Sequence, residues 1–221
     1  MITPFGEAAL LVETGTPERG QALAASLRGE PVGGVEAVIP GLSTLLVELD
    51  PLGADAAAIG ADVAARLEGL AETAPAGRRR TIPVVYGGES GPDLAAVAEL
   101  CGLSEAGVVE LHSATELRVL FDGFAPGFAY LGELPIELRV PRLETPRTRT
   151  PVGSVGIAGP MSGIYPAALP GGWRIVGRTP ITLFDPRRDP PAYLVPGDTV
   201  RFEPIDAGEW DARAAAPDGW A

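Results

Sequence analysis

The segment from Asp122 to Pro180 constrains the fold more than any other part of the chain, because it holds ten glycines and nine prolines without a repeat. Glycine supplies positive φ angles and close backbone approach, whereas proline fixes φ and removes a hydrogen-bond donor. A helix is therefore excluded here, and the backbone must follow tight turns between short extended pieces. We expect these pieces to close a glycine-rich β-barrel.

Aromatic side chains and arginines are concentrated in the same segment. Phe124, Phe128, Tyr130, Tyr165 and Trp173 are interleaved with its turns. Six arginines stand against four acidic residues, although the whole chain has a net charge of −12. Positive charge placed against an acidic field, beside aromatic rings, indicates a site for an anionic small molecule or an acidic partner. The alternative is that the corners of a barrel require these residues by themselves.

Sequence patterns divide the chain into a small domain, a barrel domain and a tail. Residues 1–76 alternate strand-like and helix-like pieces, which predicts an α+β domain whose long helix spans residues 52–74. Residues 81–205 contain the glycine- and proline-rich segment and predict a mainly β barrel domain. Residues 206–221 are rich in alanine, glycine and aspartate and predict a loose tail with two tryptophans as docking points.

Local signals predict the elements inside these domains. The run Arg78–Arg80 is interpreted as a solvated linker between them. Gly102 predicts the end of a helix that starts near Pro92, and Ser104 predicts the N-cap of a second helix that runs to about Leu111. A further helix is expected at residues 17–27, and strands are expected at 8–12, 35–40, 44–49, 82–86 and 117–121. A final pair of strands, 181–184 and 200–202, is expected to flank a turn at 196–198.

Missing residue types exclude several classes of protein. All 17 basic residues are arginines, and without lysine the chain has no P-loop lysine, no Schiff base and no biotinyl-lysine. One histidine and one cysteine cannot form a zinc site of the usual kind, so we expect no structural metal. The acidic net charge argues against nucleic acid as a partner.

Three observations predict a cytoplasmic protein. Glu7 interrupts the apolar start of the chain, so no secretion signal is expected. No apolar run approaches the roughly 18 residues that a membrane span needs, so we expect no membrane partner. The single Cys101 lies in a helical pattern and fits a reducing compartment as a buried apolar residue.

His112 and Asp122 are the candidate catalytic residues. His112 is the one histidine of the chain, and its expected place at the C-terminal end of a helix would favour its protonated form. Asp122 precedes the aromatic turn sequence and could act as a general base. The structural alternatives are a helix-end histidine without a chemical role and an aspartate that forms an Asx-turn.

Arginines and backbone donors are the candidates for binding an anion. Arg147, Arg149, Arg174 and Arg178 present planar guanidinium forks that suit carboxylate or phosphate groups. Arg178 has no acidic residue in its own turn-rich segment, so we expect its guanidinium to be available to a ligand. The glycines of 153–159 resemble a dinucleotide fingerprint, but prolines follow instead of a helix. These glycines could still form a nest of backbone N–H groups, with the Ser154 hydroxyl as a further donor.

A series of ordered motifs resembles one known family. The motifs are Ile82–Leu94, Leu111–Ser113, Gly123–Gly132, Gly153–Gly159, Gly163–Pro166, Pro170–Trp173 and Gly177–Pro180. From Gly6 to about Pro204, the chain resembles the family of the 5-oxoprolinase B subunit. That family is also known as the sporulation-kinase inhibitor family and as allophanate hydrolase subunit 1, or carboxyltransferase subdomains C and D. The chain departs from the family pattern at Met161-Ser162, where the family has Gln-Thr.

The resemblance implies an α+β N-terminal domain followed by a cyclophilin-like barrel. It implies a chain that is inactive alone and that works with 5-oxoprolinase subunits A and C to cleave 5-oxoproline, a small anionic amide, to glutamate with ATP. No covalently bound cofactor is expected, and the absence of lysine places ATP mainly outside this chain. Matched motif positions and their chemistry suggest a substrate site made of Phe124, Phe128, Tyr130, Arg147, Ser154, Tyr165, Trp173 and Arg178.

Other functions stay open at this point. The chain could be an inhibitor that binds a sensor histidine kinase, a subunit related to allophanate hydrolase or urea carboxylase, or a lone cyclophilin-like peptide binder. The substrate could equally be allophanate or another urea-derived amide.

Overall fold

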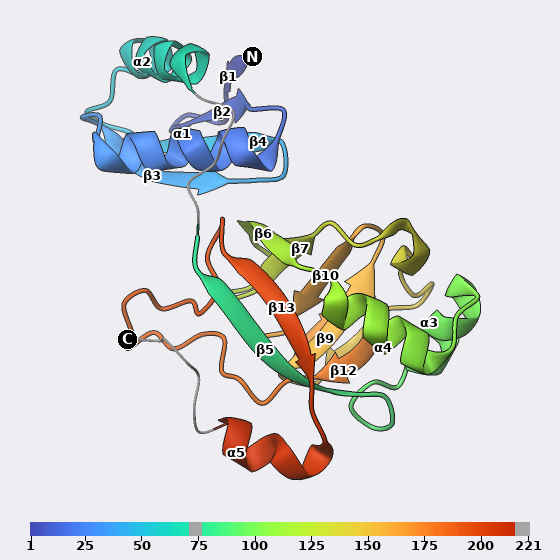
Figure 1. Cartoon of the computed structure of the whole chain (residues 1–221). Helices are drawn as coiled ribbons and strands as arrows, with labels where there is room; N and C mark the ends of the chain where they lie inside the picture. Colours follow the sequence, from blue (N-terminus) through green and yellow to red (C-terminus); the bar gives the residue numbers. More distant parts are fainter. Residues whose placement is uncertain (71–76, 215–221) are drawn as a thin grey trace. The chain divides into compact units, whose positions relative to one another are not determined.

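The computed structural model describes residues 1–70 and 77–214. The chain forms two compact units, Met1–Gly77 and Arg78–Ala221, and each is described by itself (Figure 1).

The N-terminal unit is an antiparallel sheet with two helices. Its four strands lie in the order β1-β2-β4-β3, and α1 packs on β3 and β4 while α2 packs on α1 and β2. The strands are β1 (Ile2–Pro4), β2 (Ala9–Glu13), β3 (Val35–Pro40) and β4 (Thr44–Leu49), and the helices are α1 (Pro17–Gly29) and α2 (Ala56–Gly69). Apolar residues at alternate strand positions and at helical spacing, such as Val12, Leu23, Val47 and Val63, form its core.

Helix caps fix where α1 and α2 begin. The Thr16 side chain accepts a hydrogen bond from the Arg19 amide, and Pro17 opens α1. The Asp55 carboxylate accepts from the amides of Ala57 and Ala58 at 3.0 Å, so α2 begins at Ala56 rather than at residue 52 as predicted. The helix ends at Gly69, so the predicted extension to Leu70 is wrong. The rest of that extension lies outside the described residues.

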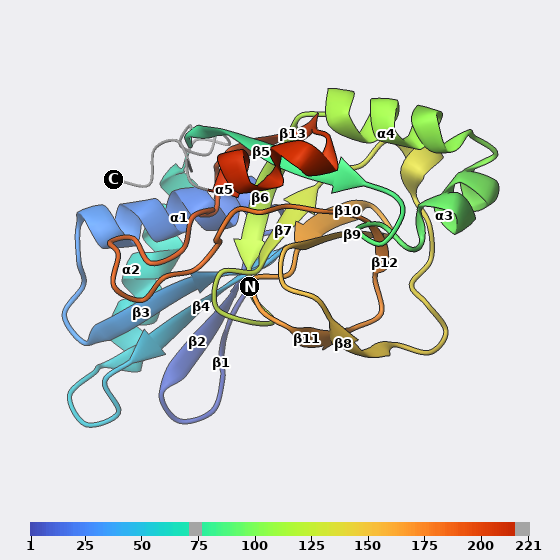
Figure 2. The same ribbon diagram turned by 90° about the horizontal axis from the view of Figure 1, so that it is seen from below.

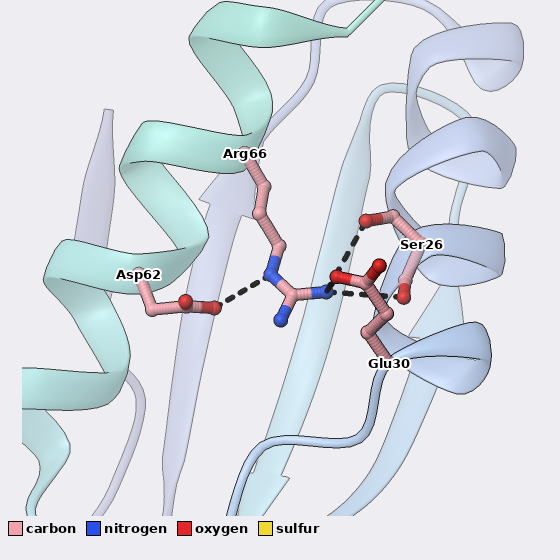
Figure 3. A network of polar contacts seen from close by, with 4 residues as sticks. All are labelled: Ser26, Glu30, Asp62 and Arg66. Carbon is pink, nitrogen blue, oxygen red and sulfur yellow. Dashed lines mark hydrogen bonds and ion pairs between the residues drawn. The ribbon is translucent and has the colours of Figure 1, made fainter.

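Arg66 ties the two helices together (Figure 3). Its Nε donates to the Asp62 carboxylate at 2.7 Å within α2. Its Nη1 donates to the carbonyl and the hydroxyl of Ser26 on α1, at 3.1 and 3.2 Å, and lies 4.0 Å from the Glu30 carboxylate. The Arg66 side chain is only 18% exposed, so these bonds are shielded better than a surface ion pair.

The C-terminal unit contains a closed barrel of seven strands in the order β10-β7-β6-β13-β5-β12-β9. All neighbouring strands are antiparallel except β13 and β5, which are parallel. The barrel strands are β5 (Arg79–Tyr86), β6 (Leu117–Asp122), β7 (Ala129–Gly132), β9 (Ser154–Ala158), β10 (Met161–Ile164), β12 (Arg174–Arg178) and β13 (Thr199–Pro204). The predicted barrel is confirmed.

Shorter elements surround the barrel. Two strands, β8 (Arg147–Thr150) and β11 (Leu169–Gly171), pair with each other as a separate sheet (Figure 2). The helices are α3 (Leu94–Cys101), α4 (Glu105–Ala114), α5 (Trp210–Ala214) and the single 3₁₀ turns η1 (Ile136–Leu138) and η2 (Ala207–Glu209). As predicted, Gly102 ends α3 with a left-handed φ of 66°, and the Ser104 hydroxyl caps α4 by accepting from the Gly107 amide at 3.0 Å.

Two predictions about the barrel strands are wrong. Residues 181–184 form no strand apart from an isolated bridge between Phe184 and Ala192. Their expected partner β13 instead lies between β5 and β6. Arg79 and Arg80 open β5 rather than forming a solvated linker. Arg80 is only 6% exposed, and its guanidinium lies 4.5 Å from the centre of the Tyr193 ring.

The described part of the predicted loose tail is ordered into short helices. Asp206 and Glu209 form a capping box around η2, and α5 follows. Trp210 lies with its ring centre 5.2 Å from the Arg178 guanidinium, so one of the two predicted docking tryptophans does dock. Trp220 lies outside the described residues.

Candidate functional site

The five aromatic residues singled out in the sequence lie together. Phe128 is the centre of the group and makes edge-to-face contacts with the four other rings. The ring centres lie 5.3 Å away for Phe124, 4.9 Å for Tyr130, 5.4 Å for Tyr165 and 5.7 Å for Trp173. Such geometry is the preferred arrangement of aromatic pairs.

Glycines in the neighbouring strands make room for these rings. Gly156 on β9 faces Gly163 on β10 in the barrel wall. A Cβ added at Gly163 would lie 3.0 Å from Phe128 and 3.1 Å from Trp173, and one at Gly156 would lie 3.1 Å from the Trp173 Cβ. Gly156 and Gly163 therefore leave space for ring packing. The motif 153–159 runs into strand β9 and, as expected, is not followed by a helix.

The rings line two pockets that share Tyr130, Arg142 and Trp173. The larger pocket, of about 490 Å³, is also lined by Phe121, Pro141, Ala158, Gly159, Pro160 and Met161. The smaller pocket, of about 90 Å³, is also lined by Phe124, Phe128, Tyr165, Pro170, Gly171 and Gly172. We call these two pockets together the aromatic site.

Arg142 is the cation of the aromatic site, and the sequence patterns did not single it out. Its side chain is exposed and, within the described residues, makes no hydrogen bond or ion pair. Burial raises the pKa of the Tyr130 and Tyr165 phenols above the usual value, and the charge of Arg142 partly offsets this rise. A guanidinium beside aromatic walls suits a small anion with an apolar body.

The two arginines that were predicted to bind substrate are held by the protein itself. Arg147 donates to the Asp93 carboxylate at 2.7 Å, and the same carboxylate accepts from the Ile175 amide at 2.6 Å. Arg178 donates from Nε to the Val152 carbonyl at 2.8 Å and stacks against Trp210. The expectation that Arg178 has no local partner is therefore wrong, since its partners are a carbonyl and a ring rather than an acid.

His112 is buried in a directed chain of hydrogen bonds. Its Nδ1 lies 2.7 Å from the Tyr86 hydroxyl and its Nε2 lies 3.0 Å from the Ser162 hydroxyl. Ser162 donates to the Gly156 carbonyl at 3.2 Å, so its oxygen accepts from Nε2–H and Nδ1 accepts from Tyr86. The His112 ring also stacks on Phe202, with 4.5 Å between ring centres.

This environment corrects the prediction that His112 is protonated. Burial lowers the pKa of His112 to about 3, so the residue is neutral rather than protonated at the end of α4. Its ring is fully buried, so a substrate cannot touch it in this structure. The structure therefore places His112 in a packed hydrogen-bond network, outside the linings of the two pockets.

Ser154 and Asp122 are also outside the pocket linings, and of the glycines of the predicted nest only Gly159 lines one of the two pockets. Ser154 is 1% exposed within β9. The amides of Gly153 and Gly159 donate to the carbonyls of Tyr165 and Val140, both at 2.7 Å, so neither can bind a ligand. Asp122 is half-buried at the end of β6 and pairs with Ala129.

The described residues offer neither a metal cluster nor a membrane span. Residues 1–70 and 77–214 contain no group of three or more histidine, cysteine, aspartate or glutamate side chains placed to hold a metal ion. No helix in the same two ranges has the length and apolar character needed to cross a membrane.

Comparison with known proteins gives consistent matches. The family model "carboxyltransferase domain, subdomain C and D" matches residues 1–194. Two relatives carry the name of the B subunit of 5-oxoprolinase. The one from Escherichia coli O157:H7 is 59% identical over 134 residues, which are 61% of this chain and 62% of the relative. The one from Bacillus subtilis (strain 168) is 38% identical over 228 aligned residues, 96% of this chain and 95% of the relative.

One solved structure extends these matches to the fold. The crystal structure of the protein TTHA0988 has a TM-score of 0.79 and 34% identity. The match covers 94% of this chain but 40% of that chain. The match to the Escherichia coli relative likewise spans less than two thirds of that protein's length.

Proposed function

Because the chain belongs to the family of the carboxyltransferase domain, subdomain C and D, we propose that it is the B subunit of an ATP-dependent 5-oxoprolinase. The names of its relatives support the proposal. The structural observation that carries it is Arg142, an exposed guanidinium that makes no hydrogen bond or ion pair in the described part of the chain and lies beside the aromatic site.

The aromatic site matches the chemistry of 5-oxoproline. This molecule is a five-membered lactam with one carboxylate, so it offers an anion for Arg142 and apolar ring faces for Tyr130 and Trp173. The pockets hold no second arginine in their linings, which favours a substrate with a single carboxylate.

The reaction needs ATP because a lactam is a poor electrophile. Transfer of the γ-phosphoryl group to the lactam oxygen releases ADP and gives an activated imidate phosphate. Water then attacks the ring carbon, the carbon–nitrogen bond breaks and the nitrogen takes up a proton, which leaves the new γ-carboxyl group as an acyl phosphate. A second water hydrolyses this acyl phosphate, and phosphate and glutamate leave. In this scheme the chain holds the substrate carboxylate, and the absence of lysine supports an ATP site that lies mainly on the other subunits.

We assign subunits A and C of 5-oxoprolinase as the partners of this chain and place the complex in the cytoplasm. We regard the barrel of the C-terminal unit as cyclophilin-like. The match covers 40% of the TTHA0988 chain, so a similar fold occurs there as part of a longer chain. This supports the proposal that the present chain works together with other subunits. The chain alone is then inactive.

Substitution of Arg142 in the complex reconstituted with subunits A and C tests the proposal. Arg142→Ala should lower kcat/KM for 5-oxoproline by about 30- to 1,000-fold, because a charge-assisted contact worth about 2 to 4 kcal/mol is lost. Arg142→Lys should restore activity only in part, since an ammonium cannot reproduce the fork.

Arg149→Ala is the matched control for Arg142. Arg149 is an exposed arginine of the same segment that lines neither pocket, so its loss should leave kcat/KM within about twofold. Equal effects of the two alanine variants would remove Arg142 from the substrate site.

A further inference from the structure

Phe124 has a backbone conformation that is unusual for a residue with a side chain. Its φ is 67°, and within residues 1–70 and 77–214 it is the one residue other than glycine with a positive φ. The Ala125 amide donates to the Gly123 carbonyl at 2.7 Å, which closes a three-residue turn with Phe124 at its centre. A turn of this kind with positive φ is rare and strained.

The chain uses glycine elsewhere for this backbone region. Among the residues that the structure describes, ten glycines have a positive φ, and Gly127 in the same loop is one of them. A glycine at position 124 would avoid the contact between Cβ and the backbone that makes the left-handed region unfavourable. With phenylalanine at position 124, the folded chain is therefore less stable than it would be with glycine at this backbone position.

Phe124 also leaves an aromatic ring in water. The residue is 58% exposed, whereas Phe128, Tyr165 and Trp173 of the same cluster are buried. Its ring touches the cluster only by its contacts to Phe128, at 5.3 Å, and Tyr165, at 6.2 Å between ring centres. Strain and exposure together indicate a residue whose partner is absent when the chain is alone.

The position of Phe124 identifies that partner as a ligand of the aromatic site. Phe124 lines the smaller pocket together with Arg142, and this pocket of about 90 Å³ accepts only a small molecule. We infer that Phe124 is a clamp whose ring closes over the apolar face of a small carboxylate held at Arg142. This inference rests on the proposed function, with 5-oxoproline as the carboxylate.

Three substitutions at position 124 separate the effect of the aromatic ring from the effect of the backbone strain. Phe124→Ala removes the ring but keeps a Cβ in the left-handed region, Phe124→Gly removes both, and Phe124→Tyr keeps both. Phe5 in the N-terminal unit is the matched control, because it is 57% exposed and lacks a positive φ.

The stability of the isolated chain tests the strain. At position 124 the glycine variant should melt about 2 to 4 °C above the alanine variant. At position 5 the order should be reversed, so that Phe5→Gly melts below Phe5→Ala. Glycine relieves no backbone strain there, and it makes the unfolded chain more flexible. An alanine variant at 124 that is as stable as the glycine variant would show that the turn is not strained and would overturn the inference.

Kinetics of the complex with subunits A and C test the clamp. Phe124→Ala and Phe124→Gly should each raise KM for 5-oxoproline about tenfold, with kcat within about twofold, since the ring contributes binding rather than chemistry. Phe124→Tyr should restore KM, and Phe5→Ala should leave it unchanged.

The possible failures point to different conclusions. A wild-type complex without activity on 5-oxoproline overturns the proposed function and the clamp with it. An active wild-type complex with an unchanged KM in Phe124→Gly overturns the clamp alone. If that variant instead assembles poorly with subunits A and C, Phe124 is a docking residue for a protein partner, which also contradicts the clamp.

Discussion

At the scale of single residues, His112 shows how a titratable group can serve packing. It joins α4 to β5 through Tyr86, to β10 through Ser162 and, through the Ser162 hydroxyl, to β9. Burial keeps the His112 ring neutral and also raises the pKa of the Tyr86 phenol. The hydrogen bonds therefore keep one direction across the whole physiological range.

The neutral His112 predicts an acid-sensitive fold. Its pKa is about 3 in the folded chain and 6.5 when unfolded, so the unfolded state binds more protons between these values. The stabilising contribution is complete above about pH 6.5 and falls as the pH drops, by up to about 1.4 kcal/mol per pH unit. Urea denaturation at several values between about pH 7 and about pH 5 measures this slope before most carboxylates titrate.

His112→Gln serves as the control for that slope. The amide keeps a hydrogen-bonding side chain but does not titrate, so the variant should be less stable near neutrality and lose most of the slope above about pH 5. The same slope in both proteins would assign the acid sensitivity to other groups.

At the scale of elements, β11 closes the aromatic site through close approach of its backbone. A Cβ added at Gly171 would lie 2.2 Å from the Tyr165 hydroxyl oxygen and 2.7 Å from two ring carbons. A Cβ added at Gly172, the next residue, would have its nearest neighbour, the Pro146 ring, at 3.5 Å. Both glycines line the smaller pocket, so they form a matched pair.

Gly171→Ala should displace Tyr165 from the aromatic cluster. We expect a loss of about 1 to 3 kcal/mol in the free energy of unfolding, because overpacking forces the buried ring or the strand to move, together with a higher KM for 5-oxoproline. Gly172→Ala should change the free energy by less than about 0.5 kcal/mol. Urea denaturation and steady-state kinetics of both variants check this, and a harmless Gly171→Ala would mean that β11 does not define the pocket.

Local sequence signals predicted the elements whose causes are local. The cap at Ser104, the helix end at Gly102 and the turns around the aromatic residues follow from neighbouring residues. The strand pair 181–184 and 200–202 was wrong because β13 pairs in parallel with β5, a strand far away in the sequence. No turn residue encodes a pairing between such distant strands.

Contacts between residues far apart in the sequence also distinguish Arg142 from the other arginines of its segment. Six arginines of one segment look alike in the sequence, and only their distant partners distinguish them. Arg147 is paired with Asp93, 54 residues away, and Arg178 contacts Trp210 from the C-terminal helix. Arg142 remains exposed beside the aromatic rings, so the type of site was predictable but the residue that carries its charge was not.

At the scale of the whole molecule, three features of the chain fit its proposed role as one part of a larger catalyst. It has a binding pocket with a cation, no lysine for a nucleotide phosphate, and a histidine that is buried away from the pocket linings. A related fold occupies 40% of a longer chain in TTHA0988. These observations fit a protein that holds a substrate while its partners supply the phosphoryl group.

The most direct measurement is the formation of glutamate from 5-oxoproline and ATP by purified subunits, with this chain present or omitted. We predict that this chain alone forms no glutamate, that subunits A and C without it form none, and that all three together release one ADP for each glutamate. Turnover by this chain alone, or full turnover by subunits A and C without it, would contradict the account.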